Sequence, residues 1–356
     1  MIEKLKAFLT EDMQGILITD AYSLRYYTGF SGGEGVALCT KQEGILYVDS
    51  RYTEAAGNET KAAGSGFTVR EFNHASPLYD QLRSQLGSAG VTAVGFEDRS
   101  LVCSTFTKYH KELGVNLLPL EDTLLNPRQI KTELELSLLR KAEEIGDLAF
   151  SHILKVLMPG ITELEVAAEL EYVMKKNGAS GLSFDTIVAS GLHSSMPHAV
   201  PTDKKLEMGD FVTMDFGCIY HGYCSDMTRT VVIGRASEEQ RRIYETVLHA
   251  QLKAMEGLRP GMKCVEVDRI ARDFISEAGY GTYFGHGLGH SVGLYIHESP
   301  ALNTRDETVL QPGMIETIEP GIYIPGFGGV RIEDMGVVTE QGYRSFARSP
   351  KMLIEL

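Results

Sequence analysis

The chain has 356 residues, of which 43% are hydrophobic, so it is long enough to form two or three domains with sizeable cores. Its 48 acidic residues outnumber its 34 basic ones, and the net charge of −14 excludes nucleic acid and anionic membranes as expected partners. No segment approaches 18 uninterrupted apolar residues and the N-terminus has no apolar leader, so we expect a cytoplasmic protein. Five cysteines without CxxC spacing predict reduced thiols rather than disulfides or a thiolate zinc site.

The N-terminal part of the chain alternates β-rich runs with helical patterns. We expect strands at residues 16–19, 36–40, 45–48, 67–72 and 93–97, and a helix at 78–86. This alternation predicts an α/β domain. The pattern breaks at Asn126-Pro127, because the residue before a proline is disfavoured in a helix. The expected domains are therefore residues 1–125 and 126–356.

The second domain contains an internal repeat. Residues 159–178 align without gaps on residues 260–279, and residues 208–217 resemble residues 312–321, which pairs Asp215 with Glu319. Capping boxes are expected at Thr132/Glu135, Thr162/Glu165 and Ser237/Gln240, and left-handed glycine caps at Gly178 and Gly279. A repeat of about 100 residues predicts a duplicated supersecondary unit, in which the ligand binds between the two halves.

Each copy of the repeat is expected to form a β-hairpin that carries two acids. In the first, a register symmetric about Tyr220/His221 places Asp215 opposite Asp226. In the second, symmetry about Gly326 places Glu319 opposite Glu333. Bare carboxylates at cross-strand distance repel each other, so four of them indicate that cations bind between the hairpins. The alternative is that each acid faces solvent, which is commoner for a single strand carboxylate but does not explain the duplication.

Histidines are candidates for the remaining ligand. Residues 285–297 (GHGLGHSVGLYIH) hold three histidines among glycines, which allow the backbone to approach a ligand closely. His198 lies in the first copy at about the place of His297 in the second. A lone histidine is more often structural, but the duplication offers one histidine from each half.

Several longer motifs carry a family resemblance. They are SLRYYTGF and DSRY in the first domain, and MDFG, SDMTRT, GHGLGHSVGL, HESP, TIEPGIYIPG and GGVRIED in the second. In order and spacing the chain resembles the Xaa-Pro aminopeptidases and prolidases (Xaa-Pro dipeptidases). The resemblance implies an α+β pita-bread (creatinase/aminopeptidase) catalytic domain behind a smaller α/β creatinase-type domain. That smaller domain would restrict substrate size and contribute to a homodimer.

The resemblance also implies roles for individual residues. Two divalent metal ions are expected on Asp215, Asp226, His290, Glu319 and Glu333, with Glu333 and one of the aspartates bridging. The oxygen-rich ligand set favours Mn²⁺ over Co²⁺, Zn²⁺ or Fe²⁺. The expected catalytic residues are His198, His297, Glu319 and Arg331, where Arg331 anchors a ligand carboxylate. Substrate contacts are expected from His198, His297 and Tyr283, with Phe284 and Tyr295 as further pocket candidates.

The expected reaction is hydrolysis of the bond before a proline at the second position of a peptide. A two-metal site lowers the pKa of a bridging water and polarises the carbonyl, and Glu319 is expected to accept the proton. Some dipeptide-specific members carry an arginine where this chain has Ala301. We therefore expect an aminopeptidase acting on longer peptides, with a dipeptidase as the alternative and a non-catalytic binding protein as the remote one. Glu316 departs from the family, which usually has an apolar residue there.

Overall fold

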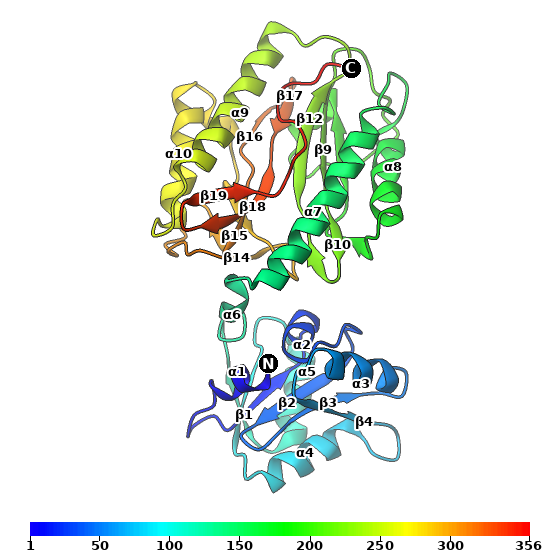
Figure 1. Ribbon diagram of the computed structural model, residues 1–356, viewed down its shortest axis with the longest axis vertical. Coiled ribbons are helices and arrows are strands. Elements are labelled where there is room, and N and C mark those ends of the chain that lie inside the picture. The colour runs from blue at the N-terminus through cyan, green and yellow to red at the C-terminus, as the bar shows by residue number, and fades with distance from the viewer. The chain divides into compact units, whose positions relative to one another are not determined.

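The computed structural model describes all 356 residues, and their contacts divide the chain into two compact units, Met1–Pro127 and Arg128–Leu356 (Figure 1). Neither unit contains a helix with the length and apolar character needed to cross a bilayer. We expected the helical pattern to break at Asn126-Pro127, but the short helix α6 (Asn126–Gln129) begins there. Asn126 and Pro127 begin this helix, because a proline is tolerated in a first turn, where its missing N–H has no partner to lose.

The N-terminal unit is built on one six-stranded mixed sheet in the order β4-β3-β2-β1-β5-β6. Its strands are β1 (Gly15–Ile18), β2 (Val36–Thr40), β3 (Gly44–Val48), β4 (Phe67–Glu71), β5 (Ala93–Phe96) and β6 (Asn116–Pro119). Its helices are α1 (Ile2–Lys6), α2 (Ala21–Thr28), α3 (Thr53–Ala62), α4 (Leu78–Ser88) and α5 (Cys103–Leu113). The expected strands are all present. Leucines of α4 and α5 pack on apolar strand residues, so these two helices bury one face of the sheet.

The C-terminal unit places one helix pair on each side of its strands (Figure 1). The helices are α7 (Glu133–Ile153), α8 (Glu163–Lys176), α9 (Glu238–Gly257) and α10 (Cys264–Glu277), with short 3₁₀ turns η1 (Gly191–Ser195) and η2 (Gly281–Tyr283). The strands of the first half are β7 (Gly181–Leu182), β8 (Ile187–Ser190), β9 (Phe211–Phe216), β10 (Cys218–Tyr220), β11 (Tyr223–Cys224) and β12 (Met227–Val232). Those of the second half are β13 (Gly289–Ser291), β14 (Glu298–Leu302), β15 (Ile315–Ile318), β16 (Gly321–Ile324), β17 (Gly328–Arg331), β18 (Asp334–Thr339) and β19 (Gly342–Ser345).

The helices reproduce the repeat of the sequence. Helices α8 and α10 each have 14 residues and occupy equivalent positions of the aligned segments. Gly178 and Gly279, which follow them, have φ values of 107° and 88°, as their predicted left-handed caps require. All three predicted capping boxes are formed. The duplication is therefore structural as well as sequential.

The two hairpins differ in how well their register was predicted. In the second, Ile315 pairs with Val337 and Gly321 with Arg331, so both paired segments are symmetric about Gly326 as predicted. In the first, Asp215 pairs with Thr228 instead of Asp226, so the prediction was wrong by two residues.

The turn of the first hairpin explains this difference. Tyr220 pairs with Tyr223 around a two-residue loop, His221-Gly222, whose φ values of 47° and 87° fit a type I′ turn. A shift of two residues changes the partner of each strand residue but keeps its face. Asp215 and Asp226 therefore remain on one face and are related diagonally.

Candidate metal centre and substrate cavity

The five predicted metal ligands come together from separate segments of the C-terminal unit. Asp215 lies on β9 and His290 on β13, whereas the other three lie in the short gaps between paired strands of the two hairpins. One cavity of about 590 Å³ is lined by all five of them and by His198, His297 and Arg331. The duplicated hairpins thus deliver their acids to one place.

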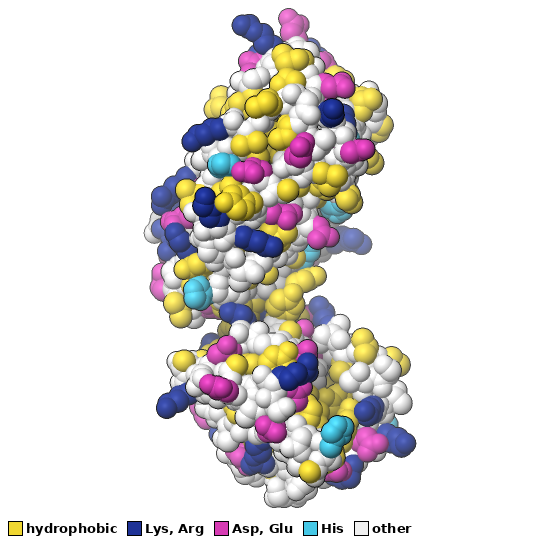
Figure 2. All heavy atoms as spheres, turned by 90° about the vertical axis from the view of Figure 1, so that its right-hand side faces the viewer, with side chains coloured by type: hydrophobic (Ala, Val, Ile, Leu, Met, Phe, Trp, Pro, Cys, Tyr) yellow, Lys and Arg dark blue, Asp and Glu magenta, His cyan; other side chains and the backbone are white.

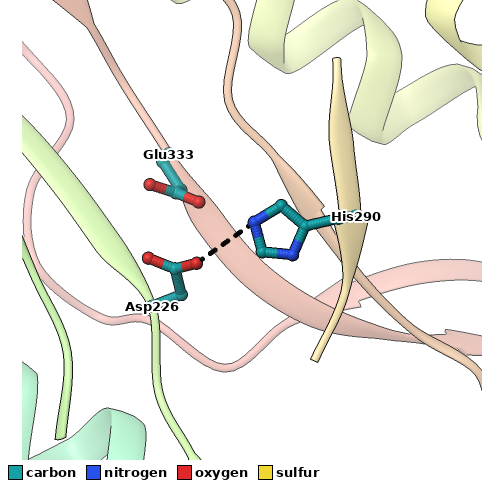
Figure 3. A group of neighbouring side chains, drawn as sticks. All are labelled: Asp226, His290 and Glu333. Atoms are coloured by element: carbon teal, nitrogen blue, oxygen red, sulfur yellow. Dashed lines mark ion pairs between the residues drawn. The ribbon is translucent and has the colours of Figure 1, made fainter. Parts of the chain in front are cut away.

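The innermost ligands are within reach of a single cation. Donor atoms of Asp226, His290 and Glu333 lie within 4.8 Å of one another, and Figure 3 shows these side chains converging from three segments. The Nε2 atom of His290 is 3.4 Å from Asp226 Oδ2 and 3.4 Å from Glu319 Oε1. The Nδ1–H of His290 donates to the Ser291 carbonyl at 3.1 Å, which leaves Nε2 to face the acids.

The electrostatics of this group are unfavourable without a cation. Burial, followed by repulsion from neighbouring carboxylates, raises the pKa of Asp226 and of Glu333 well above the usual range. The same burial raises the pKa of Glu319 to about 8. Burial and then the neighbouring His297 lower the pKa of His290 to about 4. His290 is therefore a neutral imidazole, so its 3.4 Å contacts with the acids are not ion pairs.

The residues present fit a divalent metal. The Oδ1 atom of Asp215 and the Oε1 atom of Glu333 are buried without any hydrogen-bond partner. A buried acceptor without a partner is costly, and a cation in the cavity would satisfy both oxygens. Four carboxylates and one imidazole are also the donors preferred by hard and borderline divalent ions.

A second layer of polar side chains fixes the acids. The Nη2 of Arg331 donates to Asp215 Oδ2 at 2.6 Å, and its Nε donates to the Thr228 hydroxyl at 3.0 Å. The Thr228 hydroxyl in turn donates to Glu333 Oε2 at 2.6 Å. We did not predict a role for Thr228. The signal in the sequence was its position two residues after Asp226, which places both side chains on the same face of the strand.

A second threonine joins two candidate ligands in the other half. The Thr317 hydroxyl donates to Glu319 Oε1 at 3.1 Å and accepts the backbone N–H of His290 at 3.0 Å. Its position in the repeat, where it aligns with Thr213, marked it as duplicated but not as part of the site. The two threonines hold carboxylate oxygens in place without adding charge.

Two glycines allow the strands to meet closely beside the candidate ligands. A Cβ atom at Gly217 would lie 2.0 Å from the Ser225 carbonyl oxygen, and one at Gly289 would lie 1.9 Å from the Thr317 carbonyl oxygen. Gly217 is two residues after Asp215, and Gly289 directly precedes His290. Any larger residue at either position would push a ligand-bearing strand away from its neighbour.

The expected substrate residues divide between two neighbouring cavities. The rings of His297 and His290 are 4.6 Å apart at 72°, within the cavity of the acids. His198 lines that cavity and also a second one of about 510 Å³, which includes Tyr283 and His286. The two further pocket candidates line neither cavity: Phe284 is buried in the apolar core, and Tyr295 is exposed, with its ring 6.2 Å from the ring of His297.

His286, which the sequence analysis did not assign as a metal ligand, belongs to a chain of hydrogen-bonded polar side chains in the site. Its Nε2 lies 3.0 Å from the Tyr323 hydroxyl, which accepts a hydrogen bond from Arg331 Nη1 at 2.8 Å. Burial, followed by repulsion from Arg331, lowers the pKa of His286 to about 4. Tyr323 was not predicted, and only its place in the second hairpin pointed to it.

Comparison with known proteins agrees with this architecture. Residues 137–340 match Metallopeptidase family M24, and residues 1–130 match the Creatinase/Prolidase N-terminal domain. The chain belongs to metallopeptidase family M24. The predicted family and fold are thereby confirmed, and membership implies a peptidase that uses divalent metal.

Similar proteins cover the whole chain. An Xaa-Pro dipeptidase of Pyrococcus furiosus is 41% identical over 99% of both chains. The structure of an Xaa-Pro dipeptidase from Bacillus anthracis has a TM-score of 0.95 and 44% identity, covering 100% of this chain and 99% of that one. The structure of an X-Pro aminopeptidase from Thermotoga maritima has a TM-score of 0.92 and 35% identity, with the same coverage.

Proposed function

We propose that this M24 metallopeptidase is an Xaa-Pro dipeptidase, which hydrolyses the single peptide bond of Xaa-Pro dipeptides. The observation that carries the proposal is the convergence of four carboxylates and one imidazole in the cavity that also holds His198 and His297. The similarity to Xaa-Pro dipeptidases over full length favours this function over the aminopeptidase for longer peptides that Ala301 led us to expect. The X-Pro aminopeptidase relative keeps that second candidate open to test.

The proposal includes two divalent metal ions, with Mn²⁺ as the preferred ion and Co²⁺, Zn²⁺ or Fe²⁺ as alternatives. They would be held by Asp215, Asp226, His290, Glu319 and Glu333. When bound, such a pair supplies Lewis-acid activation of water and of the scissile carbonyl. Support comes from the unpartnered oxygens of Asp215 and Glu333, and from the burial and carboxylate repulsion that raise the pKa of Asp226, Glu319 and Glu333.

The side chains of the cavity have separate tasks in this proposal. Glu319 accepts a proton from the attacking water and returns it to the proline nitrogen, a role that requires hydrogen-bond reach, and the Thr317 hydroxyl holds its carboxylate at 3.1 Å. Burial and the neighbouring His198 lower the pKa of His297, so its neutral ring can donate a hydrogen bond to the developing oxyanion. His198 orients the substrate carbonyl from the other half, and Arg331 holds Asp215.

The remaining parts of the proposal concern the setting of the enzyme. The N-terminal unit restricts peptide length and takes part in a homodimer, as the family resemblance implies. A reducing cytoplasm suits the five cysteines, none of which forms a disulfide. Figure 2 shows acidic and basic side chains interspersed on the visible face, without a continuous basic patch that would attract nucleic acid.

Hydrolysis of Ala-Pro, Ala-Pro-Ala and Ala-Ala by the purified Mn²⁺-loaded protein tests the proposal. We expect kcat/KM for Ala-Pro to exceed that for either other peptide by at least about tenfold, a difference of about 1.4 kcal/mol in transition-state binding. Faster turnover of Ala-Pro-Ala would assign the aminopeptidase function instead. No turnover of any of the three would favour a binding protein.

A further inference from the structure

Arg229 is a buried cation on the face of β12 opposite to the cavity. The hydroxyls of Thr228 and Thr230, on either side of it in the sequence, are directed toward the second hairpin. Because successive side chains of a strand point to opposite faces, the side chain of Arg229 lies behind the candidate metal centre. It is 1% exposed, and a charge so deeply buried is tolerated only where it is fully paired and hydrogen-bonded.

The main chain of the candidate ligand Glu333 is held by Arg229. The Nη1 atom of Arg229 donates to the Glu333 carbonyl at 2.5 Å and to the Thr228 carbonyl at 2.9 Å. The Thr228 carbonyl also accepts the N–H of Glu333 at 3.1 Å. The main chain of Glu333 is therefore fixed at both of its polar groups, and its carboxylate is fixed separately by the Thr228 hydroxyl. A displacement of the guanidinium would release the carbonyl of this ligand.

The remaining donors of Arg229 bind Asp334 and the C-terminal segment, residues 346–356. The Nη2 and Nε atoms donate to the carbonyls of Ser349 at 3.0 Å and Pro350 at 3.2 Å. Nη2 also donates to Asp334 Oδ1 at 2.8 Å, and Asp334 Oδ2 accepts a hydrogen bond from Lys351 Nζ at 2.7 Å. Figure 1 shows the C-terminal segment in red, running from β19 past β12 to the C-terminus. Every N–H group of the guanidinium thus has an acceptor.

The C-terminal segment is itself anchored to both helix pairs. The Asp147 carboxylate on α7 accepts the backbone N–H groups of Arg348 at 3.0 Å and of Ser349 at 2.7 Å. The Tyr244 hydroxyl on α9 donates to the Lys351 carbonyl at 2.9 Å. These residues therefore form a fixed support, which Arg229 connects to the strands of the candidate metal centre.

Glu333 is the ligand for which such a support matters most. It is expected to bridge the two metal ions, so the binding of each ion depends on its position. Side chains that hold a metal ligand in place typically change metal affinity by about 10- to 100-fold. We propose that Arg229 is a positioning residue, which joins the main chain of Glu333 to the C-terminal segment and thereby sets the affinity of the centre for its metal ions. The inference rests on the proposed dinuclear peptidase function.

Calorimetric titration of the metal-free, full-length chain with Mn²⁺ tests the proposal in Arg229→Lys. Lysine keeps the positive charge beside Asp334, but its single ammonium group cannot donate to both strands and to the C-terminal segment at once. We expect the affinity for at least one Mn²⁺ ion to fall by about tenfold or more. At a Mn²⁺ concentration that fills the parent, the electron paramagnetic resonance signal of the spin-coupled pair should weaken. Because fewer chains then hold both ions, kcat for Ala-Pro should fall while KM changes little.

Two further variants separate this role from a general effect on stability. Arg241→Lys is the matched control, because the exposed Arg241 of α9 pairs with Glu355 of the same C-terminal segment, and its Mn²⁺ affinity should equal that of the parent. Lys351→Met removes one cation from Asp334 and leaves Arg229 in place, so we expect a smaller loss of Mn²⁺ affinity than in Arg229→Lys. If Arg229→Lys does not fold, the comparison of Lys351→Met with Arg241→Lys decides the matter.

The outcomes that contradict the two proposals differ. A folded Arg229→Lys with the Mn²⁺ affinity and the spectrum of the parent, even with a lower melting temperature, would overturn the positioning role and leave the dipeptidase function standing. Equal Mn²⁺ affinities of Lys351→Met and Arg241→Lys would do the same where Arg229→Lys does not fold. A parent that binds the Mn²⁺ pair but does not hydrolyse Ala-Pro would overturn the proposed function itself.

Discussion

The two halves of the C-terminal unit hold their cavity histidines by different chemistry. In the first half, the fully buried Glu163 accepts backbone N–H groups of Ser190 at 2.7 Å and Thr202 at 3.0 Å, at the two ends of the segment that carries His198. It also accepts both hydroxyls, at 2.8 and 2.7 Å, and contacts the His193 ring at 2.9 Å. One carboxylate thus closes a loop with mainly neutral donors.

In the second half, the buried carboxylate beside the cavity histidine belongs to Glu298, directly after His297. It accepts the backbone N–H groups of Leu294 at 3.0 Å and Tyr295 at 3.2 Å. It also pairs with two buried cations, Arg128 and, at 3.2 Å, Lys131. A charged group with charged partners is more costly to disrupt than one with neutral partners, because removal leaves buried cations uncompensated. The comparison therefore predicts a larger loss of stability from removing the Glu298 carboxylate than from neutralising that of Glu163.

The largest effect is expected from Glu298→Ala. Because Arg128 and Lys131 are 6% and 5% exposed, their charges would remain buried without a partner. We expect the free energy of unfolding to fall by about 3–5 kcal/mol, measured by urea denaturation. The exposed pair of Glu307 with Lys263 supplies the control, since Glu307→Ala should cost less than about 1 kcal/mol. If Glu298→Ala and Glu307→Ala lower the free energy of unfolding equally, the burial of Arg128 and Lys131 does not make the loss of Glu298 more costly.

A smaller effect is expected from Glu163→Gln. An amide cannot accept from all the donors around this position, so we expect a loss of about 1–3 kcal/mol, with Glu340→Gln in an exposed turn as the control. KM for Ala-Pro should change as well, because the segment carrying His198 loses its anchor. If Glu163→Gln is as stable as the parent, the hydrogen bonds from neutral donors to Glu163 do not stabilise the fold as we predict.

The pH dependence of this variant follows from the ionised state of Glu163. Burial opposes ionisation, but hydrogen bonds from Thr202, His193 and Ser190 outweigh it and lower the pKa of Glu163. A lowered pKa contributes stability above the unfolded value of about 4.3, and this stability is lost as pH falls through the folded value. The stability difference between parent and Glu163→Gln should therefore shrink at acidic pH.

A third buried carboxyl, that of Glu316, extends the comparison because it accepts no hydrogen bond. Both carboxyl oxygens of Glu316 are buried without a hydrogen bond, and strand alternation places the residue on the same face as Ile318, in the apolar core beneath α9 and α10. Burial raises the pKa of Glu316 well above its usual value. Because the Glu316 carboxyl is buried, water does not solvate it. A glutamate in place of the apolar residue therefore destabilises the folded state.

The smallest change, of opposite sign, is expected from Glu316→Met. A raised pKa means that the unfolded chain ionises first, so stability is lost as pH rises above about 4.3. The methionine variant should have a higher melting temperature than the parent at pH 8, and the gain should diminish toward pH 4.5. A lower melting temperature at pH 8 would indicate that Glu316 has a stabilising partner.

The sequence predicted much of the site because the duplication constrains it. The repeat located both hairpins, and the register of the second followed from its glycine turn. The register of the first hairpin could not be predicted in the same way. A shift of two residues leaves the alternation of apolar and polar residues unchanged, and the positive φ values of His221 and Gly222 decide where the turn lies. Periodicity fixes the face of a strand before it fixes the partner.

Long-range contacts were beyond sequence reasoning. Thr228 supports Glu333 across 105 positions of the chain, and Arg305 lines the cavity from the turn that follows β14. Alternation placed Thr228 on the strand face of Asp226, but no sequence pattern showed that its hydroxyl would reach Glu333. The candidate metal ligands could be identified from the family resemblance, but the side chains that hold them in place could be identified only from the structure.

The central claim is that five side chains from the two halves form one dinuclear metal centre. Elemental analysis of the purified chain and of Asp226→Ala, after equilibration with Mn²⁺ and removal of free ions, tests it most directly. We predict about two ions per chain in the parent, and fewer ions with almost no turnover of Ala-Pro in the variant. A parent without bound metal, or a variant that hydrolyses Ala-Pro as fast as the parent, would contradict the account.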